Sequence, residues 1–237
     1  MACRRATGTQ LLLLNPDCFV RPGALAELQA ELQRMGGRGI CGPRTVFPNG
    51  SVNPTSWFRR PTLWAQFCIT FGLTAMFRGS RWFDPETVSL RKAETSFAVD
   101  IVTGCCLLAD RETWEFLKGF DETFFLYGEE FDLCLRAGLV GIPVRACPIA
   151  VVEHEGGHPD RGDANRMVHF LRGRAILSNR YLGRGSRAVG VWLWKAWVVR
   201  KLLVANLVRP LGKGRLGKLE MLRLVWRRRG EWGAGSV

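Results

Sequence analysis

The feature that most constrains the fold is a short segment, Gln10 to Leu14, whose four leucines stop abruptly at Asn15-Pro16-Asp17. A run this short and this apolar predicts a buried parallel strand that ends in a loop. Pro22-Gly23 then opens a helical pattern over 24–35, which ends at a pair of glycines. A strand, a loop and a helix in this order indicate an α/β fold, in which functional residues often lie at strand ends.

Further elements follow the same logic of apolar period and turn residues. The helix that begins at Glu129-Glu130 carries two carboxylates in its first turn, where negative charge is favoured. The predicted elements after the first helix are a strand with a turn over 40–52, a strand over 100–109, a helix over 111–117, a helix over 129–137, and strands over 142–146 and 150–152 that lead to His154.

Charge divides the chain into two parts. Residues 1–159 hold 16 Lys and Arg against 17 Asp and Glu, whereas residues 160–237 hold 18 against 4. The whole excess of the +13 net charge therefore lies in the tail. This asymmetry predicts an α/β domain over 1–160 and a basic, Trp-rich helical tail over 161–237.

The tail has the composition of an interfacial helix. Tryptophans alternate with aliphatic and basic residues over 187–229, which favours an anionic membrane surface as the partner. Lys and Arg within 189–208 disfavour a transmembrane span. Two ordinary helices with a solvated basic face are the structural alternative. An RNA partner is the weakest alternative, because the segment has no nucleic-acid motif, and we expect no nucleic acid to bind.

The eight cysteines are scattered, without a CxxC pair or a metal-ligand spacing. Several lie within apolar runs, which predicts buried free thiols in a reducing compartment. Residues 1–10 are polar, so we expect no signal peptide there. We therefore expect a cytoplasmic protein, peripheral on the inner face of the plasma membrane.

Three polar groups interrupt or end apolar elements: Asp17, the pair Glu129-Glu130, and His154. Each has a structural explanation on its own, as a cap, a solvated first turn or a strand-end histidine. In combination, Asp17 and His154 predict a site for Mg²⁺ or Mn²⁺ that a substrate diphosphate would complete. Glu130 would then accept the proton of an attacking hydroxyl.

Several strings resemble, in order and spacing, the successive blocks of bacterial family 2 glycosyltransferases of the rhamnosyltransferase-like kind. The similarity covers roughly residues 6–180. The strings are LLLLNPD with PGAL at 11–17 and 22–25, GPR and NG at 42–44 and 49–50, VTGCCLL at 102–108, GFDETFFLYGEEFDLCLR at 119–136, and HEGG at 154–157.

The resemblance implies a partial GT-A fold that lacks its first strands, with a C-terminal helical basic extension. It implies that Asp17 and His154 bind Mn²⁺ or Mg²⁺ and, through it, a nucleotide-sugar diphosphate. It implies that Glu130, beside Glu129, is the catalytic base of an inverting transfer to a lipid-linked or polysaccharide acceptor. The substrate-binding positions that it implies are Asn15, Gly104, Tyr127 and Arg136.

Two departures from the family pattern have consequences. Glu130 stands where the family usually has Asp, which lengthens the carboxylate by one methylene. Met1 falls just before the metal-binding strand, so we expect an N-terminally truncated enzyme that is poorly stable alone. The resemblance alone names rhamnose as the sugar. A noncatalytic remnant that binds membrane or a partner is the alternative function.

Overall fold

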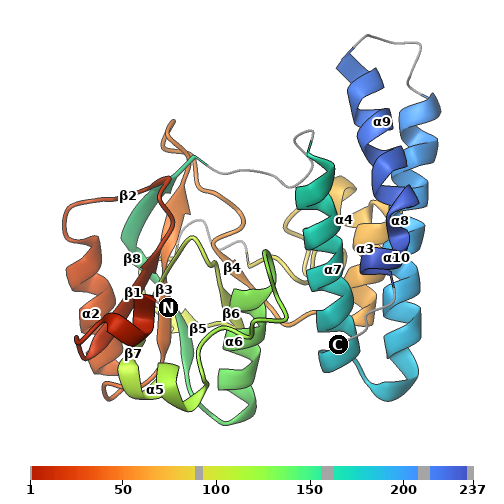
Figure 1. Cartoon of the computed structure of the whole chain (residues 1–237). Coiled ribbons are helices and arrows are strands. Elements are labelled where there is room, and N and C mark those ends of the chain that lie inside the picture. The colour runs from red at the N-terminus through yellow and green to blue at the C-terminus, as the bar shows by residue number, and fades with distance from the viewer. Residues whose placement is uncertain (1, 89–92, 156–162, 208–213, 234–237) are drawn as a thin grey trace. The chain divides into compact units, whose positions relative to one another are not determined.

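The computed structural model describes residues 2–88, 93–155, 163–207 and 214–233, which form a mixed α/β fold with C-terminal helices (Figure 1). The chain divides into two compact units. The first contains Met1–Arg60, Thr87–Glu122 and Glu129–Gly156, and the second contains Pro61–Glu86, Thr123–Gly128 and Gly157–Val237. The sequence predicts a division after residue 160, whereas in the structure two earlier segments, 61–86 and 123–128, pack with the C-terminal helices.

The first unit is built on a mixed sheet. Its described strands follow the order β1 (Gln10–Leu14), β7 (Cys106–Asp110), β3 (Ile40–Val46), β8 (Val144–His154) and β2 (Cys18–Val20), and β5 (Phe97–Ala98) pairs with the start of β8. Only β3 and β8 are parallel, and the other pairings are antiparallel.

The predicted strand at Gln10–Leu14 is confirmed as β1, but its parallel pairing is wrong. It runs antiparallel to β7, with Leu14 opposite Cys106. The Asn15 amide also donates to the Cys105 carbonyl at 2.8 Å. Since the end of β1 and the start of β7 share one edge of the sheet, the loop after β1 and the loop before β7 are brought together there.

The strand predicted over 100–109 is two strands in two sheets. β6 (Ile101–Val102) pairs with β4 (Trp57–Phe58), whereas β7 joins the main sheet. The backbone between them changes partners: the Thr103 amide bonds to Ser56, and the Cys105 carbonyl accepts from Asn15. The chain therefore breaks at Thr103-Gly104-Cys105, where it leaves one sheet for the other.

The two strands predicted over 142–152 are one strand, β8. Its register with β3 shifts between the Pro43–Cys147 and Arg44–Val151 pairs, so that residues 148–150 bulge out of the ladder. Pro148 lies in this bulge, where its missing amide hydrogen breaks no ladder bond. The bulge allows β8 to continue to His154.

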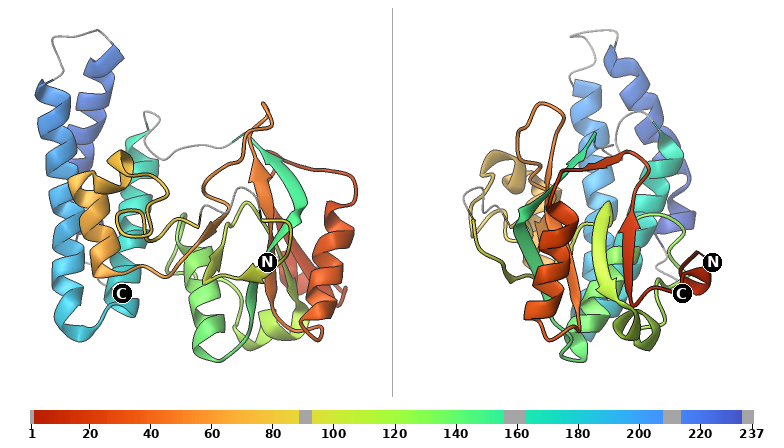
Figure 2. Two further views of the ribbon diagram at one scale, coloured as in Figure 1. Left: turned by 180° about the vertical axis from the view of Figure 1, so that it is seen from behind. Right: turned by 90° about the vertical axis from the view of Figure 1, so that its left-hand side faces the viewer.

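Helices cover both faces of this sheet. α2 (Ala24–Arg34) lies against one face, with Leu28 and Leu32 buried in a core that also contains Cys41 and Val152. α6 (Glu129–Leu139) lies on the other side of the sheet, as Figures 1 and 2 show. The helices predicted over 24–35, 111–117 and 129–137 are thus confirmed as α2, α5 (Arg111–Phe116) and α6. A short helix, α1 (Ala2–Arg5), precedes β1.

The second unit is helical, as predicted for the tail. Its described elements are α3 (Leu63–Phe71), α4 (Leu73–Met76), α7 (Ala164–Tyr181), the 3-10 turn η1 (Arg184–Ser186), α8 (Arg187–Leu207), α9 (Gly214–Arg227) and α10 (Arg229–Trp232). α7, α8 and α9 lie side by side (Figures 1 and 2). Their core includes Leu171, Trp194, Leu222 and Trp232.

α7 approaches the 123–128 segment closely at Gly173. A Cβ placed on Gly173 would lie 2.2 Å from the carbonyl oxygen of Tyr127, and this backbone atom cannot rotate away. Gly173→Ala is therefore expected to lower the free energy of unfolding by about 1–3 kcal/mol, as overpacking does. Urea unfolding followed by circular dichroism measures the change.

Gly217→Ala is the control for that substitution, because Gly217 is also helical and nothing lies within 4 Å of its Cβ position. It should stabilise by about 0.5–1 kcal/mol through helix propensity alone. Equal effects of the two substitutions would contradict the close contact at Gly173.

Candidate active site

Asp17 and His154 meet at one end of the main sheet. β2 pairs antiparallel with the end of β8, and Cys18 lies opposite His154 in that pairing. The residue before β2 is therefore beside the imidazole. Asp17 Oδ2 lies 3.3 Å from His154 Nε2, and the two side chains are 46% and 16% exposed. The pair is thus accessible from solvent through the aspartate.

Glu130 lies against Gly104. A Cβ placed on Gly104 would be 3.2 Å from the Cβ, Cγ and Cδ atoms of Glu130, so that the glutamate side chain crosses the glycine backbone. The absence of a side chain at position 104 leaves room for Glu130 in its present position. This contact joins the first turn of α6 to the break between β6 and β7.

The residue after Gly104 contacts the Asp17–His154 region. Ligand atoms of Cys105, Cys18 and His154 lie within 4.8 Å of one another. Neighbouring Cα atoms are about 3.8 Å apart, so Gly104 and Cys105 form a short bridge between Glu130 on one side and His154 on the other. A chain of contacts through Gly104 and Cys105 therefore links the three groups that the sequence singles out.

Glu129 differs from Glu130 in its surroundings. Its Oε2 atom is buried and has no hydrogen-bond partner among the described residues. Burial raises the pKa of the Glu129 carboxyl above its ordinary value of 4.5, and its own backbone amide opposes the rise. The two glutamates therefore differ: Glu129 has a buried carboxylate oxygen, whereas Glu130 packs on Gly104.

A pH-dependent stability follows from this raised pKa. Below pH 4.5 the Glu129 carboxyl is neutral in both the folded and the unfolded chain, and it costs nothing. As pH rises through the folded-state pKa, the group ionises in a poorly solvated position and stability is lost. Glu129→Gln is therefore expected to raise the urea-unfolding midpoint at pH 8, with a gain that shrinks towards pH 4.5.

The matched control for that measurement is Glu112→Gln, since Glu112 is an exposed carboxylate in the first turn of α5. Glu112→Gln removes a negative charge from a helix N-terminus, as Glu129→Gln does, but at an exposed position. A midpoint difference for Glu129→Gln that is independent of pH, or that favours the wild type at pH 8, would contradict the burial effect.

The other predicted substrate-binding residues are placed differently. Asn15 is exposed, next to Cys105 through its backbone. Arg136 is occupied by structural contacts: it donates to Asp132 at 2.7 Å, to the Gly119 carbonyl at 2.7 Å, and to the Leu117 carbonyl. Tyr127 belongs to the second unit, with a positive φ of 68° and its ring edge-on to Phe170.

Sequence reasoning missed Cys18 and Cys105. The spacing of the cysteines shows no ligand pattern, yet the fold brings these two thiols together beside His154. The Cys18 thiol donates to the Cys105 carbonyl at 3.4 Å. Interaction between the two side chains lowers the pKa of Cys18 and, together with burial, raises the pKa of Cys105. One signal was present: each cysteine directly follows a predicted site residue, Asp17 or Gly104. The prediction that the eight cysteines are free is confirmed.

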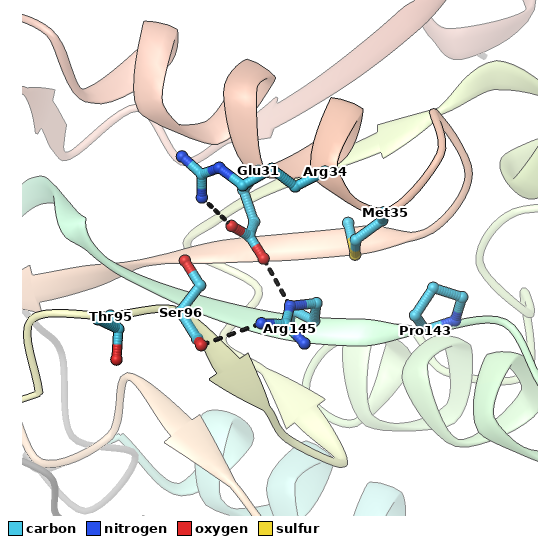
Figure 3. A pocket seen from close by; sticks show the side chains of 7 residues that line it. All are labelled: Glu31, Arg34, Met35, Thr95, Ser96, Pro143 and Arg145. Carbon is cyan, nitrogen blue, oxygen red and sulfur yellow. Dashed lines mark hydrogen bonds and ion pairs between the residues drawn. The ribbon is translucent and has the colours of Figure 1, made fainter.

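A pocket at the other end of β8 serves the fold. Figure 3 shows Glu31 between two arginines. Glu31 is 1% exposed, its Oε1 lies 2.5 Å from Arg145 Nε, and it also pairs with Arg34. Arg145 further donates to the Ser96 carbonyl at 3.0 Å. These contacts tie α2 to β8 at the end of the strand opposite His154.

The donor set of Asp17 and His154 fits a divalent cation. A carboxylate oxygen and an imidazole nitrogen lie 3.3 Å apart, and the aspartate reaches solvent. Mg²⁺ and Mn²⁺ accept such ligands and keep open positions for phosphate oxygens. Asp17 and His154 could therefore act as ligands to such an ion.

Known proteins show similarity over most of the chain. It is 29% identical to an N-acetylglucosaminyl-diphospho-decaprenol L-rhamnosyltransferase of Mycobacterium tuberculosis over 225 residues, covering 90% of this chain and 68% of the relative. It is 30% identical to the rhamnosyltransferase WbbL of Escherichia coli K12 over 193 residues, covering 77% of this chain and 69% of the relative. No family model matches.

Among solved structures, a crystal structure of GalNAc-T7 with UDP, GalNAc and Mn²⁺ aligns with a TM-score of 0.45 and 15% identity. The alignment covers 74% of this chain and 33% of that one.

Proposed function

The chain belongs to the rhamnosyltransferase-like family 2 glycosyltransferases, and from this premise we propose that it transfers L-rhamnose from a nucleotide-diphosphate donor to a lipid-linked diphospho-sugar, with inversion at the anomeric carbon. The proposal is supported by the chain of contacts that links Asp17, His154 and Glu130 through Gly104-Cys105. A polysaccharide chain end is the other acceptor with the required hydroxyl.

The names of the relatives support both substrates. The mycobacterial protein is named for rhamnose transfer to a decaprenol-linked diphospho-N-acetylglucosamine, and the E. coli protein for rhamnose transfer. An acceptor with a polyprenyl tail also suits a chain whose C-terminal part has the composition of a membrane-surface segment. We therefore assign the acceptor to the lipid-linked class.

In the proposed reaction, Glu130 accepts the proton of the acceptor hydroxyl as its oxygen attacks the anomeric carbon. The bond from that carbon to the donor diphosphate breaks, and the electron pair leaves with the diphosphate. Single displacement from the opposite face inverts the anomeric configuration. Glu130 then returns the proton to water. General-base assistance of this kind contributes about 10²- to 10⁴-fold.

Asp17 and His154 would hold Mn²⁺ or Mg²⁺ on the diphosphate side of the donor. The ion, when bound, supplies positive charge for the leaving diphosphate. Gly104 keeps the approach to Glu130 clear, and Asn15 flanks the same turn. Glu129 precedes the base in the chain and has one buried carboxylate oxygen. The noncatalytic alternative gains no support from this arrangement, since a membrane-binding remnant has no need for these groups to converge.

The test is transfer of rhamnose from a nucleotide donor to a polyprenyl diphospho-N-acetylglucosamine in the presence of Mn²⁺ or Mg²⁺. Mass spectrometry measures the product, and the anomeric coupling in its NMR spectrum reports the stereochemistry. Product of inverted configuration is expected. Product of retained configuration, or no product in the presence of either ion with the chain folded, would contradict the proposal.

We further propose that the tail binds the cytoplasmic face of an anionic membrane. On α8, side chains at helical spacing remain exposed, among them Val189, Trp192, Leu203 and Leu207. On α9, Arg223, Leu224 and Arg227 are exposed on one face. Within the described residues, no helix has the length and apolar character needed to span a bilayer.

Two of the three tryptophans on α8, a helix that the sequence assigned to the membrane surface, are core residues. Trp194 is 1% and Trp197 8% exposed, whereas Trp192 is 58% exposed. The apolar contribution to membrane binding therefore rests on Trp192 and its aliphatic neighbours on α8. The part of the segment at 208–213 lies outside the described residues.

The double variant Arg223→Gln/Arg227→Gln is expected to weaken binding to anionic vesicles roughly 30-fold, since each basic residue near such a surface contributes about 1 kcal/mol. Trp192→Ala should weaken it further. Sedimentation with vesicles of anionic and of neutral lipid, at low and high salt, measures both effects. Trp82→Ala, which removes an exposed tryptophan elsewhere in the second unit, is the control. Equal binding to neutral vesicles at high salt would contradict an electrostatic contribution.

A further inference from the structure

The turn at the candidate active site carries two thiols that the proposed transfer does not use. Cys18 and Cys105 lie with His154 so that their ligand atoms are all within 4.8 Å of one another. Cys105 is 5% exposed and Cys18 is partly exposed, so the group faces the interior on one side and can be reached from the other. From this geometry we propose that Cys18, Cys105 and His154 form a binding site for a thiophilic divalent cation, with Zn²⁺ as the ion.

The spacing of the three side chains suits tetrahedral zinc. With Zn–S of about 2.3 Å and Zn–N of about 2.0 Å, ligand atoms of a tetrahedral site are roughly 3.5–3.8 Å apart. The present separations of at most 4.8 Å need a closure of about 1.3 Å or less to reach those values. Cys18 and His154 are already fixed as opposite residues of β2 and β8, and Cys105 is fixed by the Asn15 hydrogen bond to its carbonyl. The backbone thus pre-positions all three.

Asp17 can complete the zinc site whichever nitrogen of His154 binds the ion. Its Oδ2 atom is 3.3 Å from His154 Nε2. If Nε2 binds the ion, the carboxylate is placed to be the fourth ligand. If Nδ1 binds it, the carboxylate fixes the ring from the outer sphere, as carboxylates do at many zinc sites.

The chemistry of the thiols selects the ion. Sulfur ligands favour Zn²⁺ over Mg²⁺ and Mn²⁺, which prefer oxygen. The same turn therefore offers a hard donor, Asp17, and two soft donors, with His154 shared between them. Because a neutral imidazole has one nitrogen lone pair to give to a metal, zinc bound to the cysteines would withdraw His154 from a catalytic cation. This last consequence rests on the proposed function, whereas the binding itself does not.

Cobalt titration of the full-length, reduced chain tests the site without any substrate. Co²⁺ bound by thiolates in a tetrahedral site gives a sulfur-to-cobalt charge-transfer band and intense visible bands, and Zn²⁺ added afterwards should remove both. Cys18→Ser and Cys105→Ser are expected to lose the charge-transfer intensity. Cys3→Ser removes another partly exposed thiol outside the group and should keep it.

Zinc affinity, measured by competition with a chromogenic chelator, gives the magnitude. Loss of one thiolate should weaken Zn²⁺ binding by more than the 10- to 100-fold that loss of an outer-sphere partner costs. Circular dichroism shows whether each variant is folded. If Cys105→Ser is not folded, Cys18→Ser alone tests the site, because Cys18 is partly exposed. No charge-transfer band in the reduced wild type, or equal zinc affinity in the wild type and Cys18→Ser, would overturn the site.

The shared use of His154 is tested separately, by the ratio of transfer rates with and without micromolar Zn²⁺ at fixed Mn²⁺. Inhibition that Cys18→Ser relieves, and that rising Mn²⁺ reverses, is the expected result. Inhibition of equal strength in the wild type and Cys18→Ser would overturn the shared ligand. The cobalt spectra need no activity, so a failure of the proposed transfer leaves the binding result intact.

Discussion

Glu130→Gln is expected to lower kcat of rhamnose transfer by about 10²- to 10⁴-fold, with KM for both substrates little changed. The amide keeps the shape of the side chain against Gly104 but cannot accept the acceptor proton. Since the group acts only as the hydroxyl attacks, its loss appears in kcat and in kcat/KM equally. Steady-state kinetics on the folded variant measure both.

Glu130→Asp is the matched control, because it restores the family's usual residue and keeps the carboxylate. Shortening the side chain moves the base by about 1 Å, which can cost on the order of 100-fold when the backbone is adapted to the longer residue. Glu130→Asp should therefore retain more activity than Glu130→Gln at every pH. A Gln variant as active as the wild type would exclude Glu130 as the base and turn attention to Glu129.

Local patterns predicted the elements that carry the site. The leucine run of β1, the Pro-Gly start of α2 and the acidic start of α6 are each determined by neighbouring residues, and all three are present in the structure. The ends of these elements hold Asp17 and Glu130, so the candidate residues followed from the same reasoning. Local sequence is sufficient where the signal is a periodicity and a cap.

Pairing between distant strands could not be read in the same way. No residue near Leu11–Leu14 indicates that β1 runs antiparallel to β7. No residue near Gly104 indicates that the chain passes from one sheet to the other there. Both depend on backbone groups that find partners more than 40 residues away, as Asn15 does at Cys105 and Thr103 does at Ser56. The cluster of Cys18, Cys105 and His154 is a product of those pairings, so the spacing of the cysteines did not reveal it.

Asp17→Ala is expected to reduce metal-dependent transfer by about 10²- to 10³-fold, the usual cost of removing one electrostatic contributor to the transition state. The Mn²⁺ concentration for half-maximal activity should rise as well, because His154 alone remains to hold the ion. The side chain is 46% exposed and makes its contact with His154, so the fold should tolerate its removal. Activity as a function of Mn²⁺ concentration separates the two effects.

Glu94→Ala removes an exposed carboxylate of the same unit and should change neither the rate nor the Mn²⁺ requirement. Asp17→Asn, which keeps an oxygen but loses the charge, is expected to fall between the wild type and Asp17→Ala, with partial recovery at high Mn²⁺. This ordering follows because a neutral amide oxygen binds a divalent cation more weakly than a carboxylate does. An Asp17→Ala enzyme with the wild-type rate and Mn²⁺ requirement would remove the metal site from the proposal and leave Glu130 to be explained without it.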